Sequence, residues 1–208
     1  FLYADLVLDQ LPDDKTIKND FNSLVDIAHS TKHLVEKVML ISSLDSGEKK
    51  PVVLSEIVSK IIEHDKVTSN IRIAVEQTID KNCPPVIGDD KQLRQVVESV
   101  IDNAILAMED QDGVIRVDLR PISTSDDSPE RFDEVQLMIS DTGVGMTEKT
   151  LTQIFNPFFT TRTVGKGKGI GLAIVYNIIQ NMGGSISATS KPGEGSEFLI
   201  RFPVRKTS

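Results

Sequence analysis

The sequence lacks the features of several protein classes. It has a single cysteine, Cys83, among 208 residues, which excludes an intramolecular disulfide or a cysteine-based metal cluster and fits a reducing compartment. No run approaches the roughly 20 apolar residues of a membrane span, and the first residues carry acids where a secretory signal carries bases. We therefore expect a cytoplasmic chain without membrane contact of its own, which leaves room for membrane attachment of a longer protein.

Basic residues are fewer than acidic residues. The chain has 23 Lys and Arg against 31 Asp and Glu, for a net charge of −8, which argues against binding to nucleic acid or to an anionic membrane. Any phosphate that the protein binds must therefore be held by local geometry. Ten of the 13 glycines follow Ser140. Since glycine inside helices and strands lowers stability, this placement indicates loops that approach something closely.

The pattern changes near residues 45–51. Upstream, residues 21–44 repeat apolar side chains at intervals of three and four, which predicts a long helix with a heptad-type seam. Residues 1–11 are also helical in pattern, and a Pro-Asp-Asp break separates the two stretches. We predict a helical hairpin over residues 1–46. It either packs on its own domain or forms half of an intermolecular four-helix bundle, which we favour because two helices cannot bury both of their apolar faces.

Downstream, residues 51–208 mix helix and strand signals. Apolar periodicity predicts helices over 54–62, 90–108, 147–154 and 170–182. Strands are predicted around 71–75, 114–119, 135–140, 186 and 198–202, with a rigid turn at 83–88. Because several strands are consecutive, a mixed sheet with helices on one face is favoured over a doubly wound parallel sheet. The predicted fold class is α+β: a helical hairpin followed by a two-layer α/β sandwich.

The first candidate for a ligand contact is Asp141, which follows the predicted strand 135–140 and begins the sequence Asp-Thr-Gly-Val-Gly. The pattern is as typical of a strand-terminating turn as of a binding site. In the second interpretation, the carboxylate accepts a hydrogen bond from an exocyclic amine. Gly143 and Gly145 would then lack Cβ atoms so that a flat ring can lie against the backbone.

The second candidate is Asn103, in the middle of the helix predicted over 90–108 and among apolar neighbours. Asn has low helix propensity and can hydrogen-bond to its own backbone, so an exposed or capping role is one interpretation. The other is an oxygen ligand for Mg²⁺, which prefers hard oxygen donors together with substrate phosphates.

A glycine-rich stretch, residues 165–172, leads directly into the helix predicted over 170–182. The N-terminus of a helix offers unpaired N–H groups and a positive dipole end to phosphate. Arg162, Lys166 and Lys168 add positive charge to an otherwise acidic chain. The spacing does not match a P-loop or a dinucleotide fingerprint, and the length of this loop indicates a functional lid.

Taken in order, these motifs resemble those of the histidine-kinase-type ATP-binding domain. The stretches that carry the resemblance are Asn103-Ala104, Asp141–Gly145, Phe155–Thr161, Gly165–Leu172 and Gly193–Phe198. They lie within residues 51–204, over which the resemblance implies the Bergerat-type α/β sandwich that sensor histidine kinases share with gyrase-type ATPases. It also implies ATP and Mg²⁺ as cofactors.

The resemblance assigns roles to individual residues. Asp141 would bind the adenine amino group, Asn103 would coordinate Mg²⁺, and residues 166–171 would close over the phosphates. The complete set implied to bind the nucleotide is Asn103, Asp141, Gly143, Gly145, Phe158, Thr160, Thr161, Arg162, Lys166, Gly167, Lys168, Gly169, Ile170, Gly171 and Leu172.

The hairpin resembles the dimerisation hairpin of sensor kinases just after its phosphoacceptor histidine. That histidine is expected roughly three helical turns, ~15 Å, upstream of Phe1. The implied activity is transfer of the γ-phosphate to this histidine, and then to an aspartate on the receiver domain of a response regulator, by a homodimer. His29 and His33 are interpreted as solvated side chains, and His64 ends a predicted helix instead of opening a hairpin. The chain is therefore expected to bind ATP without labelling itself.

Three positions depart from the family pattern. Ser99 stands where the family often has Asn and hydrolysing relatives have Glu, Leu106 where a basic or amide side chain often reaches a phosphate, and Lys168 where Thr is frequent. The missing Glu one turn before Asn103 favours a kinase over an ATPase. The alternatives left open are a Bergerat-fold ATPase, a nucleotide-binding switch without histidine kinase activity, and a dimerisation module that binds no nucleotide.

Overall fold

The computed structural model describes residues 17–27, 31, 48–63, 72–109, 111–123, 132–162 and 169–204. The chain divides into two compact units, Phe1–Ser42 and Ser43–Ser208. In the first unit, residues 17–27 and 31 are helical, so the helix predicted from residue 21 begins at least four residues earlier than expected. The rest of the predicted hairpin, with His29 and His33, lies outside the described residues, and so does His64.

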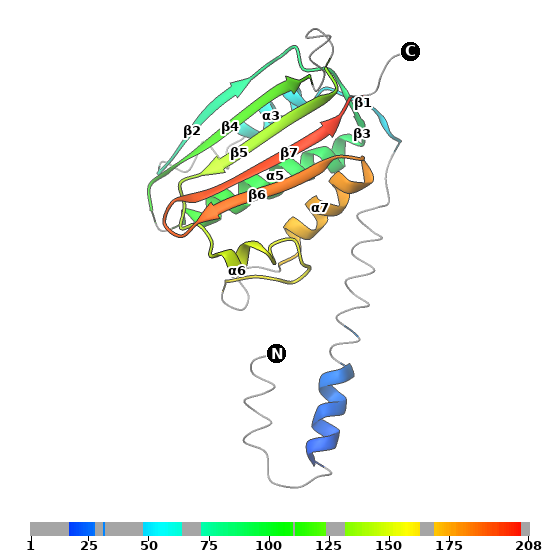
Figure 1. Cartoon of the computed structure of the whole chain (residues 1–208), viewed down its shortest axis with the longest axis vertical. Coiled ribbons are helices and arrows are strands. Elements are labelled where there is room, and N and C mark those ends of the chain that lie inside the picture. The colour runs from blue at the N-terminus through cyan, green and yellow to red at the C-terminus, as the bar shows by residue number, and fades with distance from the viewer. Residues whose placement is uncertain are drawn as a thin grey trace. The chain divides into compact units, whose positions relative to one another are not determined.

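The second unit is built on a five-stranded sheet (Figure 1). Its strands lie in the order β2 (Ile73–Ile79), β4 (Gly113–Ile122), β5 (Glu134–Asp141), β7 (Gly195–Pro203) and β6 (Ser185–Lys191). The pair β2–β4 is parallel, and the other three pairs are antiparallel. The predicted mixed sheet is therefore confirmed.

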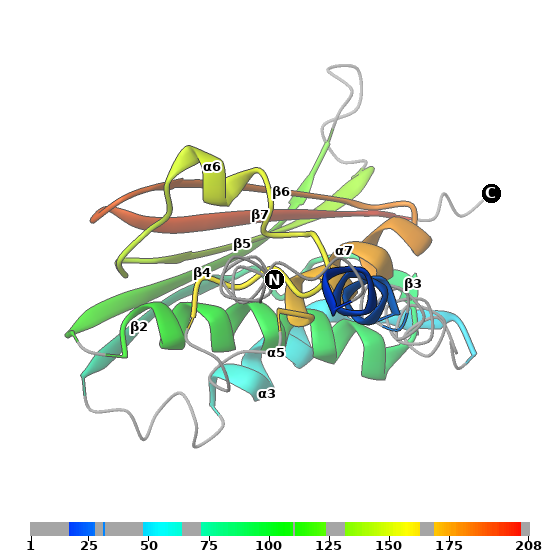
Figure 2. The same ribbon diagram turned by 90° about the horizontal axis from the view of Figure 1, so that it is seen from below.

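Three helices cover one face of this sheet (Figure 2). They are α3 (Leu54–Ile62), α5 (Asp90–Ala107) and α7 (Gly171–Asn181), and α5 packs against both of the others. The predicted start of α5 is confirmed, since the Asp89 carboxylate accepts a hydrogen bond from the Gln92 N–H at 2.9 Å. The opposite face of the sheet carries ion pairs such as Arg116–Glu76 at 2.7 Å. The sandwich thus has two layers.

The hydrophobic core lies between the helices and the sheet. Side chains from both layers are completely buried there, among them Leu93 of α5, Ile115 of β4, Leu137 of β5 and Ile200 of β7. Alternate residues of β4 and β5 point into this core. Burial of this kind is the main favourable contribution to folding, and it fixes the ends of β5 and α5 beside each other.

Two local predictions were wrong. Residues 83–88 do not form only a turn, because β3 (Val86–Gly88) pairs antiparallel with β1 (Lys50–Val52). These strands give a weak sequence signal, since each has three residues and β1 contains Pro51. The helix predicted over 147–154 is the single turn α6 (Glu148–Leu151), which Thr147 caps. Within the part of the chain that the structure describes, no helix is long and apolar enough to cross a membrane.

Candidate functional site

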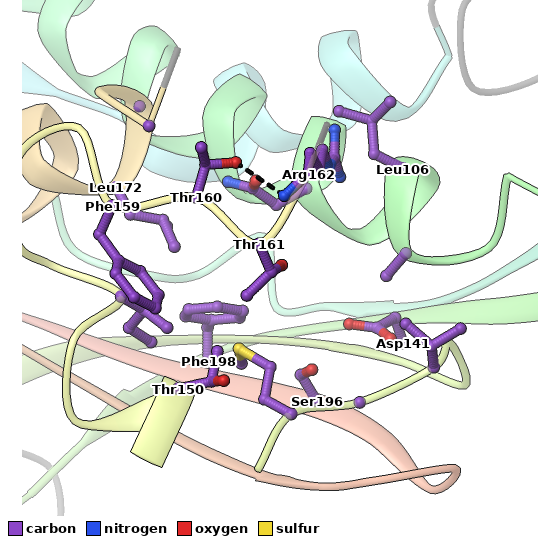
Figure 3. A pocket seen from close by; sticks show the side chains of 18 of the residues that line it. Leu106, Asp141, Thr150, Phe159, Thr160, Thr161, Arg162, Leu172, Ser196 and Phe198 are labelled. Carbon is purple, nitrogen blue, oxygen red and sulfur yellow. Dashed lines mark hydrogen bonds between the residues drawn. The ribbon is translucent and has the colours of Figure 1, made fainter. Parts of the chain in front are cut away.

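A cavity of about 540 Å³ lies where the ends of β5 and α5, the start of α7 and strand β7 meet (Figure 3). It gathers residues from motifs that are far apart in the sequence. Ten of the fifteen predicted nucleotide-binding residues line it: Asn103, Asp141, Gly145, Thr160, Thr161, Arg162, Gly169, Ile170, Gly171 and Leu172. Lys166, Gly167 and Lys168 lie outside the described residues, and Gly143 and Phe158 are not part of the lining.

Asp141 is the last residue of β5 and is only 7% exposed. Its Oδ1 accepts a hydrogen bond from the Gly143 N–H at 2.8 Å. Burial raises the pKa of the Asp141 carboxyl, while the N–H groups of Gly143 and Ser196 act in the opposite direction. The backbone thus holds a desolvated acceptor at the cavity wall, where a hydrogen-bond donor on a ligand would compensate for lost water.

Asn103 reaches the cavity from the middle of α5. Its Nδ2 donates one of its two hydrogens to the Ser99 carbonyl at 2.7 Å, so the acceptor Oδ1 and the second N–H are available to a ligand. The hydrogen bond to its own helix is thus confirmed, and the role of its oxygen as a Mg²⁺ ligand stays a prediction. Within the described ranges, no three His, Cys, Asp or Glu side chains form a metal cluster. A hard cation at Asn103 would thus need additional oxygens from a bound ligand.

The third part of the site is the start of α7. No side chain caps this helix at Ile170, so its first N–H groups have no side-chain acceptor, and Gly169, Ile170 and Gly171 line the cavity. Arg162 adds a positive charge to the lining, and its backbone N–H donates to Thr160 Oγ1 at 3.2 Å, the dashed line in Figure 3. Helix dipole and guanidinium together favour an anionic group at this end.

The glycines of the Asp141 motif are closely packed against other parts of the chain. A Cβ at Gly143 would lie 2.7 Å from the Cβ of Ala107 on α5, and a Cβ at Gly145 would collide with the Lys191 carbonyl. Gly145 also has a φ of 63°, which favours glycine. Packing within the chain therefore requires glycine at both positions, and their role in making room for a ring stays a prediction. Their missing side chains let the loop pack against α5 and against the turn between β6 and β7.

The backbone of Phe158 has an unusual conformation and lies against Gly169. Its φ of 62° is uncommon for a residue other than glycine. Gly169, with a φ of 64°, packs against it so closely that an added Cβ would lie 2.6 Å from the carbonyl oxygen of Phe159. The backbone on either side of residues 163–168 is therefore held together at the cavity.

Several lining residues had no predicted role. The sequence motifs include Phe159, Ser196 and Phe198, but assign none of them to the ligand. Alternation along β7 could have placed Ser196 and Phe198 on one side of that strand, but not beside Asp141. Leu106 was noted as a departure from the family pattern, and the remaining lining residues that were missed are Ala107, Glu109, Gln111, Val144, Met146, Thr150 and Ile154.

The two ends of the cavity differ in character. Ser196 is the direct cross-strand neighbour of Asp141, and Phe198, Phe159 and Leu172 continue from there as an apolar wall (Figure 3). Leu106, which is 41% exposed, also lines the cavity. The end at Asp141 therefore suits a flat ring with a hydrogen-bond donor. The end at Arg162 and the start of α7 suits an anion.

Comparison with known families agrees with this geometry. Residues 88–206, more than half of the chain, match the family described as histidine kinase-, DNA gyrase B-, and HSP90-like ATPase. The chain belongs to this family. The prediction of a histidine-kinase-type ATP-binding domain with the corresponding α/β fold is thereby confirmed.

The chain is also similar to individual proteins. Sporulation kinase A of Bacillus subtilis is 32% identical over 173 residues, which cover 83% of this chain and 27% of that protein. The mycobacterial sensor histidine kinase MprB superposes with a TM-score of 0.62 at 26% identity, over 76% of this chain and 99% of that structure. The histidine kinase ThkA, solved in complex with the response regulator TrrA, superposes with a TM-score of 0.60 at 22% identity, over 93% of this chain and 53% of ThkA. The chain spans 14–27% of the length of the first three curated relatives that it matches.

Proposed function

We propose that this chain is the ATP-binding catalytic core of a sensor histidine kinase. The observation that carries the proposal is the convergence of Asp141, Asn103 and the start of α7 on one cavity. A buried carboxylate, a side-chain amide oxygen and an uncapped helix N-terminus match the amino group, the metal and the phosphates of Mg²⁺-ATP, respectively. In this proposal Asp141 accepts from the adenine amino group, and the base lies along Phe198 and Leu172.

The phosphates lie toward Asn103, Arg162 and α7, with the lid residues Lys166, Gly167 and Lys168 closing over them. Mg²⁺, when bound, neutralises charge on the phosphates. The protein contributes by holding Oδ1 of Asn103 in place through the hydrogen bond to Ser99. Since phosphoryl transfer depends chiefly on positioning and charge neutralisation, this fixed oxygen and the lid cations are the main contributions of the chain.

A kinase is favoured over a steady ATPase by the residue one helical turn before Asn103. Ser99 stands there and has no carboxylate to activate water. Glu98 is adjacent, but one residue along a helix turns a side chain by about 100°. Exclusion of water by the closed lid would leave the γ-phosphate for a protein acceptor.

In the whole protein, a histidine upstream of Phe1 accepts the phosphate and passes it to an aspartate of a response regulator. Neutral imidazole is a competent nucleophile near pH 7. Residues 1–46 form the dimerisation and phosphotransfer hairpin in this proposal, and residues 51–208 form the catalytic domain. The exposure of Leu24 and Ile27, at 64% and 62%, supports a partner helix in a homodimer. The complex of the similar kinase ThkA with a response regulator supports the second partner.

The experiment is to add radiolabelled ATP to this chain and to a longer chain that contains the preceding helix. We expect both to bind ATP, and only the longer one to acquire phosphate that is labile in acid and stable in alkali. Steady hydrolysis of ATP without a protein acceptor would instead indicate an ATPase. Binding without labelling of the longer chain would indicate a nucleotide-dependent switch, and no binding would leave a dimerisation module.

A further inference from the structure

Ser190, near the end of β6, has a hydroxyl group with three partners. The Met146 N–H donates to Ser190 Oγ at 2.8 Å. The Ser190 hydroxyl donates to the Gly195 carbonyl at 2.7 Å. A third contact, 3.1 Å long, joins Ser190 Oγ to Ser196 Oγ. Ser190 itself is not part of the cavity lining, whereas Met146 and Ser196 are.

The direction of the third hydrogen bond follows from counting protons. A serine hydroxyl has one hydrogen and two lone pairs. The hydrogen of Ser190 is engaged by the Gly195 carbonyl, which only accepts, and one lone pair takes the Met146 N–H. Ser196 must therefore be the donor in the 3.1 Å contact. With its hydrogen directed at Ser190, Ser196 Oγ has only lone pairs left for a ligand in the cavity.

Ser196 lies where the direction of its hydroxyl hydrogen can affect ligand binding. It is 9% exposed and pairs directly with Asp141 across β5 and β7. The cavity wall thus carries two neighbouring acceptors, a carboxylate and an oriented hydroxyl. A purine with an amino group at this point supplies hydrogens to them, whereas a purine with a carbonyl oxygen places a third acceptor against two. Because unpaired polar groups weaken binding, this arrangement discriminates between the two kinds of purine.

We propose that Ser190 is a positioning residue that sets the preference for a 6-amino over a 6-oxo purine, by fixing the direction of the Ser196 hydroxyl. The inference rests on the proposed function, since it takes the ligand to be a purine nucleotide with its base beside Asp141. It goes further by assigning base selectivity to a residue outside the cavity. The hydroxyl of Ser196 becomes free to turn and donate to a carbonyl when Ser190 is removed.

The test compares the affinities of the chain for ATP and for inosine triphosphate (ITP), by calorimetric titration in the presence of Mg²⁺. ITP replaces the 6-amino group by a 6-oxo group and carries a proton at N1. In Ser190→Ala, the ratio of the ITP to the ATP dissociation constant should fall about 2- to 10-fold, the size of one ordinary hydrogen bond. Ser187→Ala makes the same chemical change at an exposed position of β6 and should leave the ratio as in the parent chain.

The ratio separates this role from a general structural one. Loss of packing between β6 and the Met146 loop would weaken both nucleotides equally, so an unchanged ratio in a variant that unfolds cooperatively would overturn the inference. If the ratio is unchanged but the parent chain binds ATP, this inference fails and the proposed function stands. If the parent chain binds neither nucleotide, the inference and the proposed function both fail.

A second pair of variants keeps the inference testable if Ser190→Ala does not fold. Ser196→Ala removes the oriented acceptor, and it too should lower the ratio. In a chain that already carries Ser196→Ala, adding Ser190→Ala should have no further effect on the ratio, because the two changes act through one hydroxyl. An unchanged ratio in Ser196→Ala, or equal effects of Ser190→Ala in both backgrounds, would contradict the proposal.

Discussion

At the scale of single residues, the buried Asp141 carboxylate lowers stability near neutral pH, and in the proposed function it contributes to binding. The carboxylate is nearly buried, and the site holds it with the Gly143 N–H instead of with a basic side chain. In the proposed complex, the adenine amino group completes its hydrogen bonding. A hydrogen bond to a charged group contributes about 1.5–3 kcal/mol, which sets the scale of the first prediction.

Asp141→Ala should raise the ATP dissociation constant roughly 10- to 150-fold, because it removes this charge-assisted hydrogen bond. Calorimetric titration measures the effect. Asp112→Ala, at an exposed position before β4, is the matched control and should bind as the parent chain does. A change of less than twofold in Asp141→Ala would refute the adenine contact.

Asp141→Asn should make the chain more stable near neutral pH. Burial raises the pKa of Asp141 in the folded state, so the folded chain binds this proton more tightly than the unfolded chain. Above both pKa values the ionised carboxylate therefore lowers the free energy of unfolding, and this penalty disappears as the pH falls below the ordinary carboxyl pKa of about 4. Thermal unfolding should show a higher Tm for the variant at pH 7 and a smaller difference near pH 4. A difference that grows toward acid pH would contradict the assigned direction.

Lys168→Ala should weaken ATP more than ADP. Leu106 lines the cavity but has no charge or hydrogen-bonding group for a phosphate. In the proposed function the lid cations supply this interaction, most strongly for the γ-phosphate. Lys60→Ala removes a charge from α3, where Lys60 pairs with Glu56 at 3.7 Å, and serves as the control. Equal losses for ATP and ADP in Lys168→Ala would count against a role at the γ-phosphate.

At the scale of elements, the hairpin of β6 and β7 supports the loop that follows β5. The Gly193 N–H donates to the Val144 carbonyl at 2.8 Å, and Gly195 lies so close to Asp141 that an added Cβ would collide with its carbonyl oxygen. The first and last glycine motifs are therefore packed backbone against backbone. This contact requires glycine at positions 145 and 195.

Two glycines of the hairpin allow a matched comparison. Gly193 and Gly195 have φ values of 78° and 85°, but a Cβ at Gly193 would meet nothing within 4 Å. Gly193→Ala should therefore lose about 1–2 kcal/mol of stability from its left-handed backbone. Gly195→Ala should lose about 2–5 kcal/mol, because steric overlap is added to the same conformational effect. Chemical denaturation measures both, and similar losses would argue against the close contact of the two loops.

The longer elements could be predicted from the sequence because their signals are local. The apolar periodicity of α5 and the cap at Asp89 define that helix without reference to the rest of the chain. The pairing of β1 with β3 could not be predicted, since three-residue strands with Pro51 have no such pattern. The close packing of Gly145 could not be predicted either. Its close neighbour Lys191 is 46 residues away, and only the tertiary structure brings them together.

At the scale of the whole molecule, the order of the motifs predicted which residues line the cavity, but it did not predict how these residues are arranged. Asp141, Asn103 and Gly169–Leu172 were assigned from the sequence and line one cavity. Ser196 was not assigned, because its position beside Asp141 depends on the register of β5 and β7. Strand register is set by long-range packing, which a single sequence does not display.

The most direct measurement is calorimetric titration of Mg²⁺-ATP into the chain, its Asp141→Ala variant and its Asn103→Ala variant. The account predicts one ATP per chain, a large loss of affinity in Asp141→Ala with or without Mg²⁺, and a loss in Asn103→Ala that disappears when Mg²⁺ is removed. No heat of binding in the parent chain, or full affinity for Mg²⁺-ATP in both variants, would contradict it.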